Sequence, residues 1–282
     1  MDSNELFIIS IQRSGSNWLH RCLAEHSAIS INGEINVSAA LLAIDQIRAG
    51  DKVAEQKLKS SSSFRQATQE FIKQLMIANL DSGMKAEAGY LADKTAFPSV
   101  ISLKKKPEQV EYAKILEQYF PKAKKILIVR NSRDVLVSFS EWKKQVIGNL
   151  LAPTPHSFRF FIRHLNNWCI LHERWLADID HDPSWLVISY EELKSDFVST
   201  LERVFQFLEL EVNKNFMAET KERLYRIDSP VYQKENAERG YGFFRNGAVG
   251  EWEDKFSWWH KLIYNLFFKA RVENIYKKIQ KL

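Results

Sequence analysis

Cysteine, long apolar runs and low-complexity segments are scarce in this sequence. Only two of its 282 residues are cysteines, Cys22 and Cys169, so we expect two buried thiols in a reducing compartment rather than a disulfide framework. No apolar run approaches the ~18 residues that cross a bilayer, and the first residues, MDSNEL, lack the basic and apolar parts of a secretion signal. The sequence therefore predicts a cytoplasmic protein, with residues 1–282 forming one domain.

The charge and composition narrow the class of function. A hydrophobic content of 45% and a charged content of 27% are ordinary for a globular protein. The net charge of +5 suits a small polyanionic ligand but is too weak to indicate nucleic acid. No histidines and cysteines stand at metal-ligand spacing, so we expect no metal site.

Apolar runs predict the strands. Leu6–Ile9, Lys125–Val129 and Trp185–Ser189 are unbroken apolar runs typical of buried strands, and Ile29–Ile31 and Tyr90–Lys94 predict two shorter ones. Segments with helical spacing separate them. This alternation predicts an α/β fold with a central parallel sheet flanked by helices.

Helical spacing of apolar residues predicts helices from Trp18, over 37–50, Phe64–Leu80 and Glu108–Phe120, from Asp134, over 158–178, from Ser195 or Asp196 to about Leu208, and over 258–282. The last of these is amphipathic and basic. We expect its aromatic face to pack on the core, with weak peripheral contact with a membrane, or a partner helix, as the alternatives.

A polar turn, QRSGSN, joins the first strand to the first helix. A strand that passes through a turn of small residues into a helix N-terminus is a ready anion site, because backbone N–H groups and the helix dipole converge there. A plain strand-turn-helix is the alternative. Within the turn Arg13 adds a charge and Gly15 lies at the tightest point, and neutral donors come from Ser14, Ser16 and Asn17.

Two later residues strengthen the anion-site interpretation. Arg130 and Tyr190 each follow a predicted strand, as Arg13 does. Ligands of parallel α/β folds bind beyond the carboxyl ends of the strands, so we expect these three side chains to converge. The sequence has no G-x-x-x-x-G-K-[ST] loop, and this absence weighs against a nucleotide kinase, for which a requirement for Mg-ATP would be the test.

Four motifs, in order, resemble those of the sulfotransferase family, most closely its cytosolic branch. They are QRSGSNW (12–18), RNSRDVLVSF (130–139), YEELKSD (190–196) and FFRNGAVGEWEDKF (243–256). The resemblance covers nearly the whole chain and includes a P-loop-like phosphosulfate-binding loop. It implies transfer of a sulfuryl group from 3′-phosphoadenosine-5′-phosphosulfate (PAPS) to an acceptor hydroxyl or amine, without a metal.

The same resemblance assigns the donor contacts. Arg13 and the amides of Ser14 to Asn17 would hold the 5′-phosphosulfate, and Arg130 with Ser138 would bind the 3′-phosphate. Arg245, Asn246 and Gly247 of a late loop would close over that phosphate, where Asn246 replaces a lysine common in the family. Contacts with adenine or ribose come from Tyr190, Trp18 and Phe244, although simple core packing is an equal alternative for Trp18.

The catalytic groups depart from the cytosolic pattern. Lys94, in DKTAFP, aligns with the lysine of the K-T-H-x-P segment and would bind the transferring oxygens, but the catalytic histidine falls on Ala96. Glu34, in LAEHSAISINGE, resembles the glutamate base of bacterial and Golgi-type members, and Asp93 or a histidine is the alternative base. Arg13 also belongs to the catalytic set, since it would neutralise the leaving phosphate.

The remaining expectations concern Arg133 and Asp134, the acceptor, the oligomeric state and an alternative function. Arg133 and Asp134 are expected to be a surface pair and a helix cap. The acceptor is expected to be a small molecule that is lipid-like, phenolic or polyketide-like, or else a glycan, enclosed by residues 37–90 and 143–160. The family's dimer motif is not visible, and the oligomeric state stays open. Because of Ala96, a catalytically silent protein that binds PAPS or the desulfated 3′-phosphoadenosine-5′-phosphate (PAP) is the alternative function.

Overall fold

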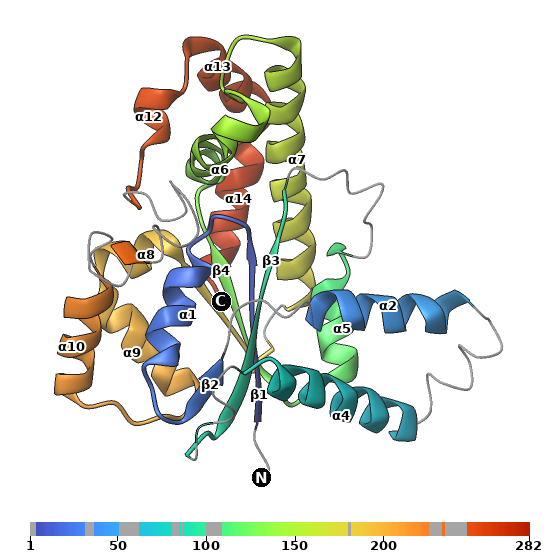
Figure 1. Cartoon of the computed structure of the whole chain (residues 1–282). Coiled ribbons are helices and arrows are strands. Elements are labelled where there is room, and N and C mark those ends of the chain that lie inside the picture. Colours follow the sequence, from blue (N-terminus) through green and yellow to red (C-terminus); the bar gives the residue numbers. More distant parts are fainter. Residues whose placement is uncertain are drawn as a thin grey trace.

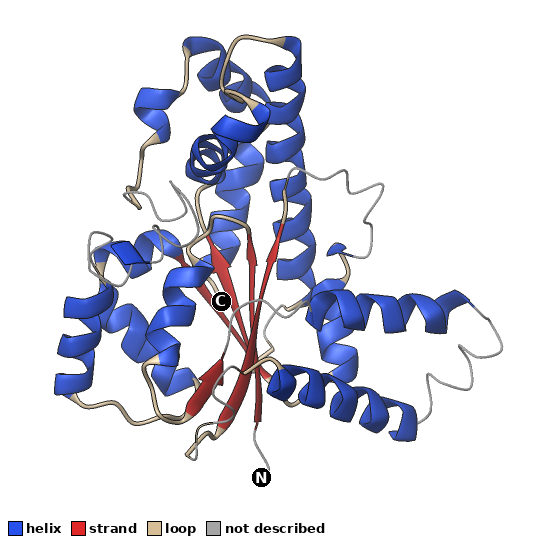
Figure 2. Cartoon of the chain, viewed as in Figure 1, coloured by secondary structure: helices blue, strands red, loops and turns tan. Residues whose placement is uncertain are grey.

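The computed structural model describes residues 4–31, 37–50, 62–80, 85, 87–99, 109–179, 182–225, 233–234 and 247–282. A sheet with strand order β2-β3-β1-β4-β5, parallel at every neighbouring pair, is covered by helices on both faces (Figures 1 and 2). The strands are β1 (Asn4–Ile11), β2 (Ile29–Ile31), β3 (Tyr90–Phe97), β4 (Lys124–Val129) and β5 (Trp185–Ser189). The predicted α/β fold with a central parallel sheet is confirmed.

The two faces of the sheet belong to two hydrophobic cores. Leu6 and Ile8 of β1 point into one core, and Phe7 and Ile9 point into the other, as the alternation of side chains along a strand requires. Because both faces are covered, β1 is apolar without interruption from Leu6 to Ile9. β3 instead carries the buried polar residues Asp93, Lys94 and Thr95. β1 and β3 run further than predicted, because their pairing continues to Ile11 opposite Phe97.

The helices divide between these cores. On one side lie α1 (Ser16–Ala24), α8 (Tyr190–Ser195), α9 (Phe197–Phe207) and α10 (Lys214–Leu224). The other core takes α2 (Val37–Gly50), α4 (Ser62–Ala78), α5 (Tyr112–Tyr119), α6 (Ser132–Ile147), α7 (Pro155–Asp178), α12 (Trp252–Lys255), α13 (Trp258–Phe267) and α14 (Lys269–Ile279). Figure 1 shows α12 and α13 beyond the carboxyl ends of the strands. No helix within the described ranges is long and apolar enough to cross a membrane.

The observed helices differ from the expected ones in the cap of α6 and in the continuity of the C-terminal helix, besides shifts in the bounds of α5 and α7. Helix α6 begins at Ser132, and the side chain of Asn131, not Asp134, caps it by accepting a hydrogen bond from the Arg133 N–H. Asn131 serves as the cap because its amide oxygen stands two residues before a free N–H of the first turn. The C-terminal helix is two helices, α13 and α14, interrupted at Phe268, where no glycine or proline marks the break.

Both cysteines are buried and free, as expected. Cys22 packs in the core beneath α1, and Cys169 packs in the core beneath α7. Burial raises the pKa of both thiols, so neither is a reactive nucleophile.

Candidate functional site

Three adjacent strands end beside one another and present the predicted side chains. Arg13 lies two residues after β1, Arg130 directly follows β4, and Tyr190 directly follows β5. Since β1, β4 and β5 are neighbours in the sheet, these residues meet at its carboxyl edge. The expected convergence is confirmed.

The loop after β1 leads directly into helix α1. Gly15 occupies the N-cap position with φ of 90°, and its carbonyl accepts hydrogen bonds from the N–H groups of Trp18 and Leu19. Glycine has no side chain to cap the helix, so the first N–H groups of α1 remain available to another acceptor. Within the described part of the chain, the buried Ser14 hydroxyl has no hydrogen-bond partner. These groups suit an anionic ligand.

Arg130 ties the loop after β1 to the late loop. Its guanidinium donates to the carbonyl oxygen of Arg13 at 3.0 Å and to that of Ala248 at 2.9 Å. It also stacks on the ring of Tyr190, 4.2 Å from the centroid. The Nε of this buried arginine has no hydrogen-bond partner among the described residues. A buried cation with an unused donor is a suitable contact for a phosphate.

The side chain of Arg13 contacts Ser138, which the family resemblance places at the 3′-phosphate and not at the 5′-phosphosulfate. Its Nε donates to Ser138 Oγ at 3.1 Å, and its guanidinium lies 5.4 Å from the ring centroid of Trp142. The backbone of Arg13 has φ of 73°, an uncommon conformation for a residue with a side chain. The two expected anion sites are therefore connected by a single side chain.

Lys94 meets the N-terminus of α1 from the neighbouring strand. Its ammonium group donates to Asn17 Oδ1 at 2.5 Å. Ala96, two residues further along β3, lies on the same face as Lys94 and pairs with Ser10 of β1. Asp93 belongs to the opposite face, where its carboxylate accepts from the Thr95 hydroxyl at 3.1 Å. This placement turns Asp93 away from the N-terminus of α1, where Lys94 lies.

The late loop is fastened to the site at Gly247 and Ala248. The Tyr190 hydroxyl donates to the Gly247 carbonyl at 2.7 Å, and burial raises the pKa of this tyrosine, so it stays protonated as a donor. Gly247 has φ of 60°. The part of the loop that precedes Gly247, including Phe244, Arg245 and Asn246, lies outside the described residues.

Asp134 and Arg133 are not the expected surface pair. The Asp134 carboxylate is buried and accepts from the N–H groups of Gly250 at 2.8 Å and Trp252 at 3.1 Å. Arg133 lies under Trp252, with its guanidinium 3.5 Å from the ring centroid. The physical reason is the return of the C-terminal segment to the start of α6, which covers both residues.

Trp18 is placed mainly by packing. Its ring is 8% exposed and stacks on Phe197, and its indole N–H donates to the Leu224 carbonyl at 2.6 Å. This geometry favours the core-packing alternative over a donor contact. Glu34, the expected base, lies outside the described residues, three positions after the end of β2 at Ile31.

His164, in α7, was not predicted from the sequence, but its side chain connects two segments next to the site. Its ring nitrogens lie 2.6 Å from Ser99 Oγ and 2.8 Å from the Ser132 carbonyl, joining the segment after β3 to the start of α6. Burial lowers the pKa of His164 to about 4. A lone histidine in an apolar helical pattern gives no sequence signal of this kind.

Glu191 and Asp134 were also missed as supporting residues. Glu191 accepts a hydrogen bond from the Asn131 N–H at 2.8 Å and so joins the start of α8 to the N-terminus of α6. Both carboxylates stand inside the quoted motifs YEELKSD and RNSRDVLVSF, so the motifs themselves carried the signal. Among the residues that the structure describes, no three histidine, cysteine, aspartate or glutamate side chains are grouped to hold a metal ion.

Comparisons with known proteins agree with this geometry. A model of the sulfotransferase family matches residues 5–214. Human sulfotransferase 2A1 is 31% identical over 165 residues, which cover 50% of this chain and 55% of that protein. A 3-beta-hydroxysteroid sulfotransferase from Cavia porcellus is 28% identical over 154 residues, which cover 48% and 51%. The chain therefore spans about half the length of the curated relatives it matches.

The fold has solved counterparts. The crystal structure of mouse sulfotransferase SULT7A1 complexed with PAP aligns with a TM-score of 0.57 and 20% identity, over 99% of this chain and 90% of that one. At this identity the likeness concerns the fold alone.

Proposed function

The chain belongs to the sulfotransferase family, and we propose that it transfers the sulfuryl group of PAPS to a hydroxyl or amine of a small or mid-sized acceptor. The observation that carries this proposal is the convergence of Arg13, Arg130 and Tyr190 at the carboxyl edge of the sheet. The buried Nε of Arg130 and the Ser14 hydroxyl, both without partners within the described ranges, support an anionic ligand there.

PAPS carries negative charge at two separated places. In the proposal, the N-terminus of α1 with Arg13 holds the 5′-phosphosulfate, and Arg130 with Ser138 holds the 3′-phosphate. The contact between Arg13 and Ser138 supports an exchange in which each side chain turns to its own phosphate when the donor binds. Tyr190 and Gly247 would enclose the nucleoside from the other side.

The proposed chemistry is an in-line transfer. An acceptor oxygen bonds to sulfur while the bond from sulfur to the bridging phosphate oxygen breaks, and PAP leaves. Glu34 takes the acceptor proton, and Lys94, beside Asn17 at the helix N-terminus, stabilises the charge on the transferring oxygens. Ala96 lies on the same face as Lys94 and has no group that accepts a proton, so the base must come from elsewhere.

The proposed acceptor is lipid-like or phenolic. Aromatic side chains near Arg13 support it: Trp142 and Phe139 pack edge to face, and Phe160 lies against Phe139. The steroid named for the Cavia porcellus relative is a hydroxylated, apolar molecule of this kind. A cytoplasmic location stays a prediction from the sequence.

Titration calorimetry with PAP, compared with adenosine-5′-phosphate, tests the donor proposal. We expect tight binding of the bisphosphate alone, because only it reaches both anion sites. Equal binding of the two nucleotides, or no binding of either, would overturn the proposed sulfotransferase activity. If PAP bound but a broad panel of acceptors gave no turnover, the alternative of a catalytically silent PAPS-binding protein would replace the enzyme.

The exposed face of α13 supports a further proposal, peripheral contact with an anionic membrane. Trp258 and Leu266 are 75% and 66% exposed, and Leu262 lies between them at helical spacing. The segment from Ser257 to Val272 contains no acidic residue, and a basic helix with an apolar, tryptophan-bearing face is typical of binding in the membrane interface.

Cosedimentation with phosphatidylserine vesicles, compared with phosphatidylcholine vesicles, tests this contact. We expect Leu262→Ser to reduce binding and Phe71→Ser, on the exposed face of α4, to leave it unchanged. Absence of binding to both vesicles would overturn the proposal. Sedimentation equilibrium would then show whether a second copy of the chain covers this face instead.

A further inference from the structure

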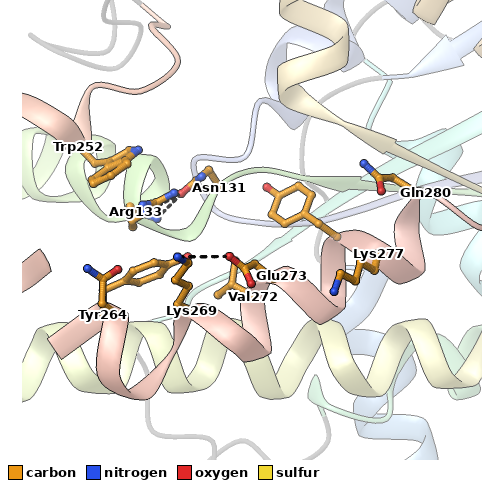
Figure 3. A pocket seen from close by; sticks show the side chains of 11 residues that line it. Asn131, Arg133, Trp252, Tyr264, Lys269, Val272, Glu273, Lys277 and Gln280 are labelled. Atoms are coloured by element: carbon orange, nitrogen blue, oxygen red, sulfur yellow. Dashed lines mark hydrogen bonds and ion pairs between the residues drawn. The ribbon is translucent and has the colours of Figure 1, made fainter. Parts of the chain in front are cut away.

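A pocket of about 550 Å³ opens behind Arg133, between the start of α6 and the last helices (Figure 3). One side carries Asn131, Arg133 and Trp252, and the other carries Lys269 and Lys277 of α14. None of the residues proposed to bind PAPS lines it. A volume of this size accommodates a small organic molecule.

Arg133 is held rigidly at the pocket wall. Its guanidinium lies 3.5 Å from the ring centroid of Trp252 and 4.4 Å from that of Tyr264, and Figure 3 shows Arg133 between the two rings. Its Nε donates to Asn131 Oδ1 at 3.1 Å. Two stacked rings and one hydrogen bond fix the plane of the guanidinium, so little side-chain entropy is lost when a ligand binds to it.

Among the described residues, the two terminal amino groups of Arg133 have no hydrogen-bond acceptor. Within the described part of the chain they form no hydrogen bond or ion pair with a carboxylate; the contacts of this side chain are with Asn131, Trp252 and Tyr264. A planar guanidinium with both amino groups available matches the two oxygens of a carboxylate, sulfate or phosphate group.

The other side of the pocket carries further charged side chains besides the guanidinium of Arg133. Lys269, Lys277 and Arg133 are the cationic residues of the lining, and Glu273 is its one anionic residue. The carboxylates of Asp134 and Glu253 also act on Arg133 from outside the lining. Glu273 lies 3.8 Å from Lys269, which leaves Lys277 and Arg133 for a ligand. The buried Tyr276 hydroxyl, which has no hydrogen-bond partner among the described residues, adds a neutral donor.

We propose that this pocket is a second anion-binding site, which takes a small molecule with an oxyanion group on a flat or apolar body. The oxyanion binds the amino groups of Arg133 and is approached by Lys277. The apolar body lies against Val272 and the edge of Trp252, which both line the pocket. The site is separate from the proposed donor site, so the two ligands bind at the same time.

Ligand-observed NMR titration of phenyl phosphate into the full chain saturated with PAP tests this site. Saturation with PAP removes the donor site as a competing anion site. We expect phenyl phosphate to bind, and inorganic phosphate to bind more weakly because it lacks the apolar body. Absence of phenyl phosphate binding to the PAP-saturated protein would overturn the proposal.

Two variants and a matched control assign the binding to the pocket. Lys277→Gln should weaken phenyl phosphate binding about two- to fivefold, as for a partly exposed charge. Arg133→Lys should weaken it roughly tenfold or more by removing the fork. Lys278→Gln, one residue from Lys277 but outside the pocket, should leave binding unchanged.

The two proposals fail separately. If Lys277→Gln bound phenyl phosphate as well as the unmodified chain, the pocket would not be the site, even if Arg133→Lys proved unstable. If PAP itself did not bind, the proposed function would be wrong. The comparison of Lys277→Gln with Lys278→Gln on the unliganded chain would still decide the pocket.

Discussion

The ring of Tyr190 lies directly against Gly15. A Cβ atom on Gly15 would stand 2.3 Å from Cδ2 and 2.8 Å from Cε2 of Tyr190, closer than carbon atoms approach. The backbone of Gly15 also has φ of 90°, a conformation that favours glycine. The tightest point of the loop after β1 is thus fixed both by its own backbone and by a side chain from the end of β5.

Gly15→Ala should destabilise the protein more than the same substitution at another glycine whose backbone also has a positive φ. The strain costs about 1 to 2 kcal/mol, and displacement of Tyr190 costs roughly 1 to 3 kcal/mol more. Urea unfolding measures the difference. The control is Gly250→Ala, with φ of 82° but only Glu253 Oε1 nearby, at 3.9 Å. Equal destabilisation by both variants would mean that Tyr190 moves aside freely.

Arg130→Ala should weaken PAP binding about ten- to a hundredfold, because a charge-assisted contact contributes roughly 1.5 to 3 kcal/mol. The same change releases the carbonyls of Arg13 and Ala248. Calorimetry measures the affinity, and Arg203→Ala, which removes only an exposed pair with Glu192, is the control. Unchanged affinity in Arg130→Ala would show that the 3′-phosphate binds elsewhere.

Glu34→Gln should reduce turnover about a hundredfold or more, the typical contribution of a general base, and leave PAP affinity within a few-fold. Glutamine keeps the size of the side chain but takes no proton. Glu25→Gln, which removes a surface pair with Arg223, should retain full activity. A Glu34→Gln enzyme with near-normal turnover would assign the base to another residue.

The pH dependence of stability should carry a contribution from His172. Burial lowers its pKa to about 4, from an ordinary value of 6.5. Below pH 6.5 the unfolded chain takes up a proton at this histidine and the folded chain does not. The free energy of unfolding therefore falls as the pH is lowered from 6.5 toward 4, by up to about 1.4 kcal/mol per pH unit.

His172→Phe isolates this contribution. Phenylalanine keeps the packing against Trp168 and Trp175 but cannot titrate. Urea unfolding over this pH range should show a shallower loss of stability in the variant than in the unmodified chain. Identical slopes would mean that His172 is protonated in the folded state, with its ring accessible to water.

The pattern of the sequence determined the class of fold and the place of the candidate site. An apolar run such as Lys125–Val129 indicates a strand that is buried on both faces. The residue that follows the run therefore lies at the carboxyl edge of the sheet. For this reason Arg130 and Tyr190 were predicted at the site without knowledge of the strand order. The resemblance to the family motifs then suggested the chemical roles proposed for these residues, which spacing alone does not indicate.

Tertiary structure alone decided which groups touch. The register of β3 against β1 sets Lys94 beside Asn17 and turns Asp93 to the other face. The return of the C-terminal segment buries Asp134 under the N–H groups of Gly250 and Trp252, 116 and 118 residues away, and it creates the pocket at Arg133. Local periodicity reports which side of an element is apolar. It holds no information on which distant segment packs against that side, since the packing of the whole chain selects those contacts.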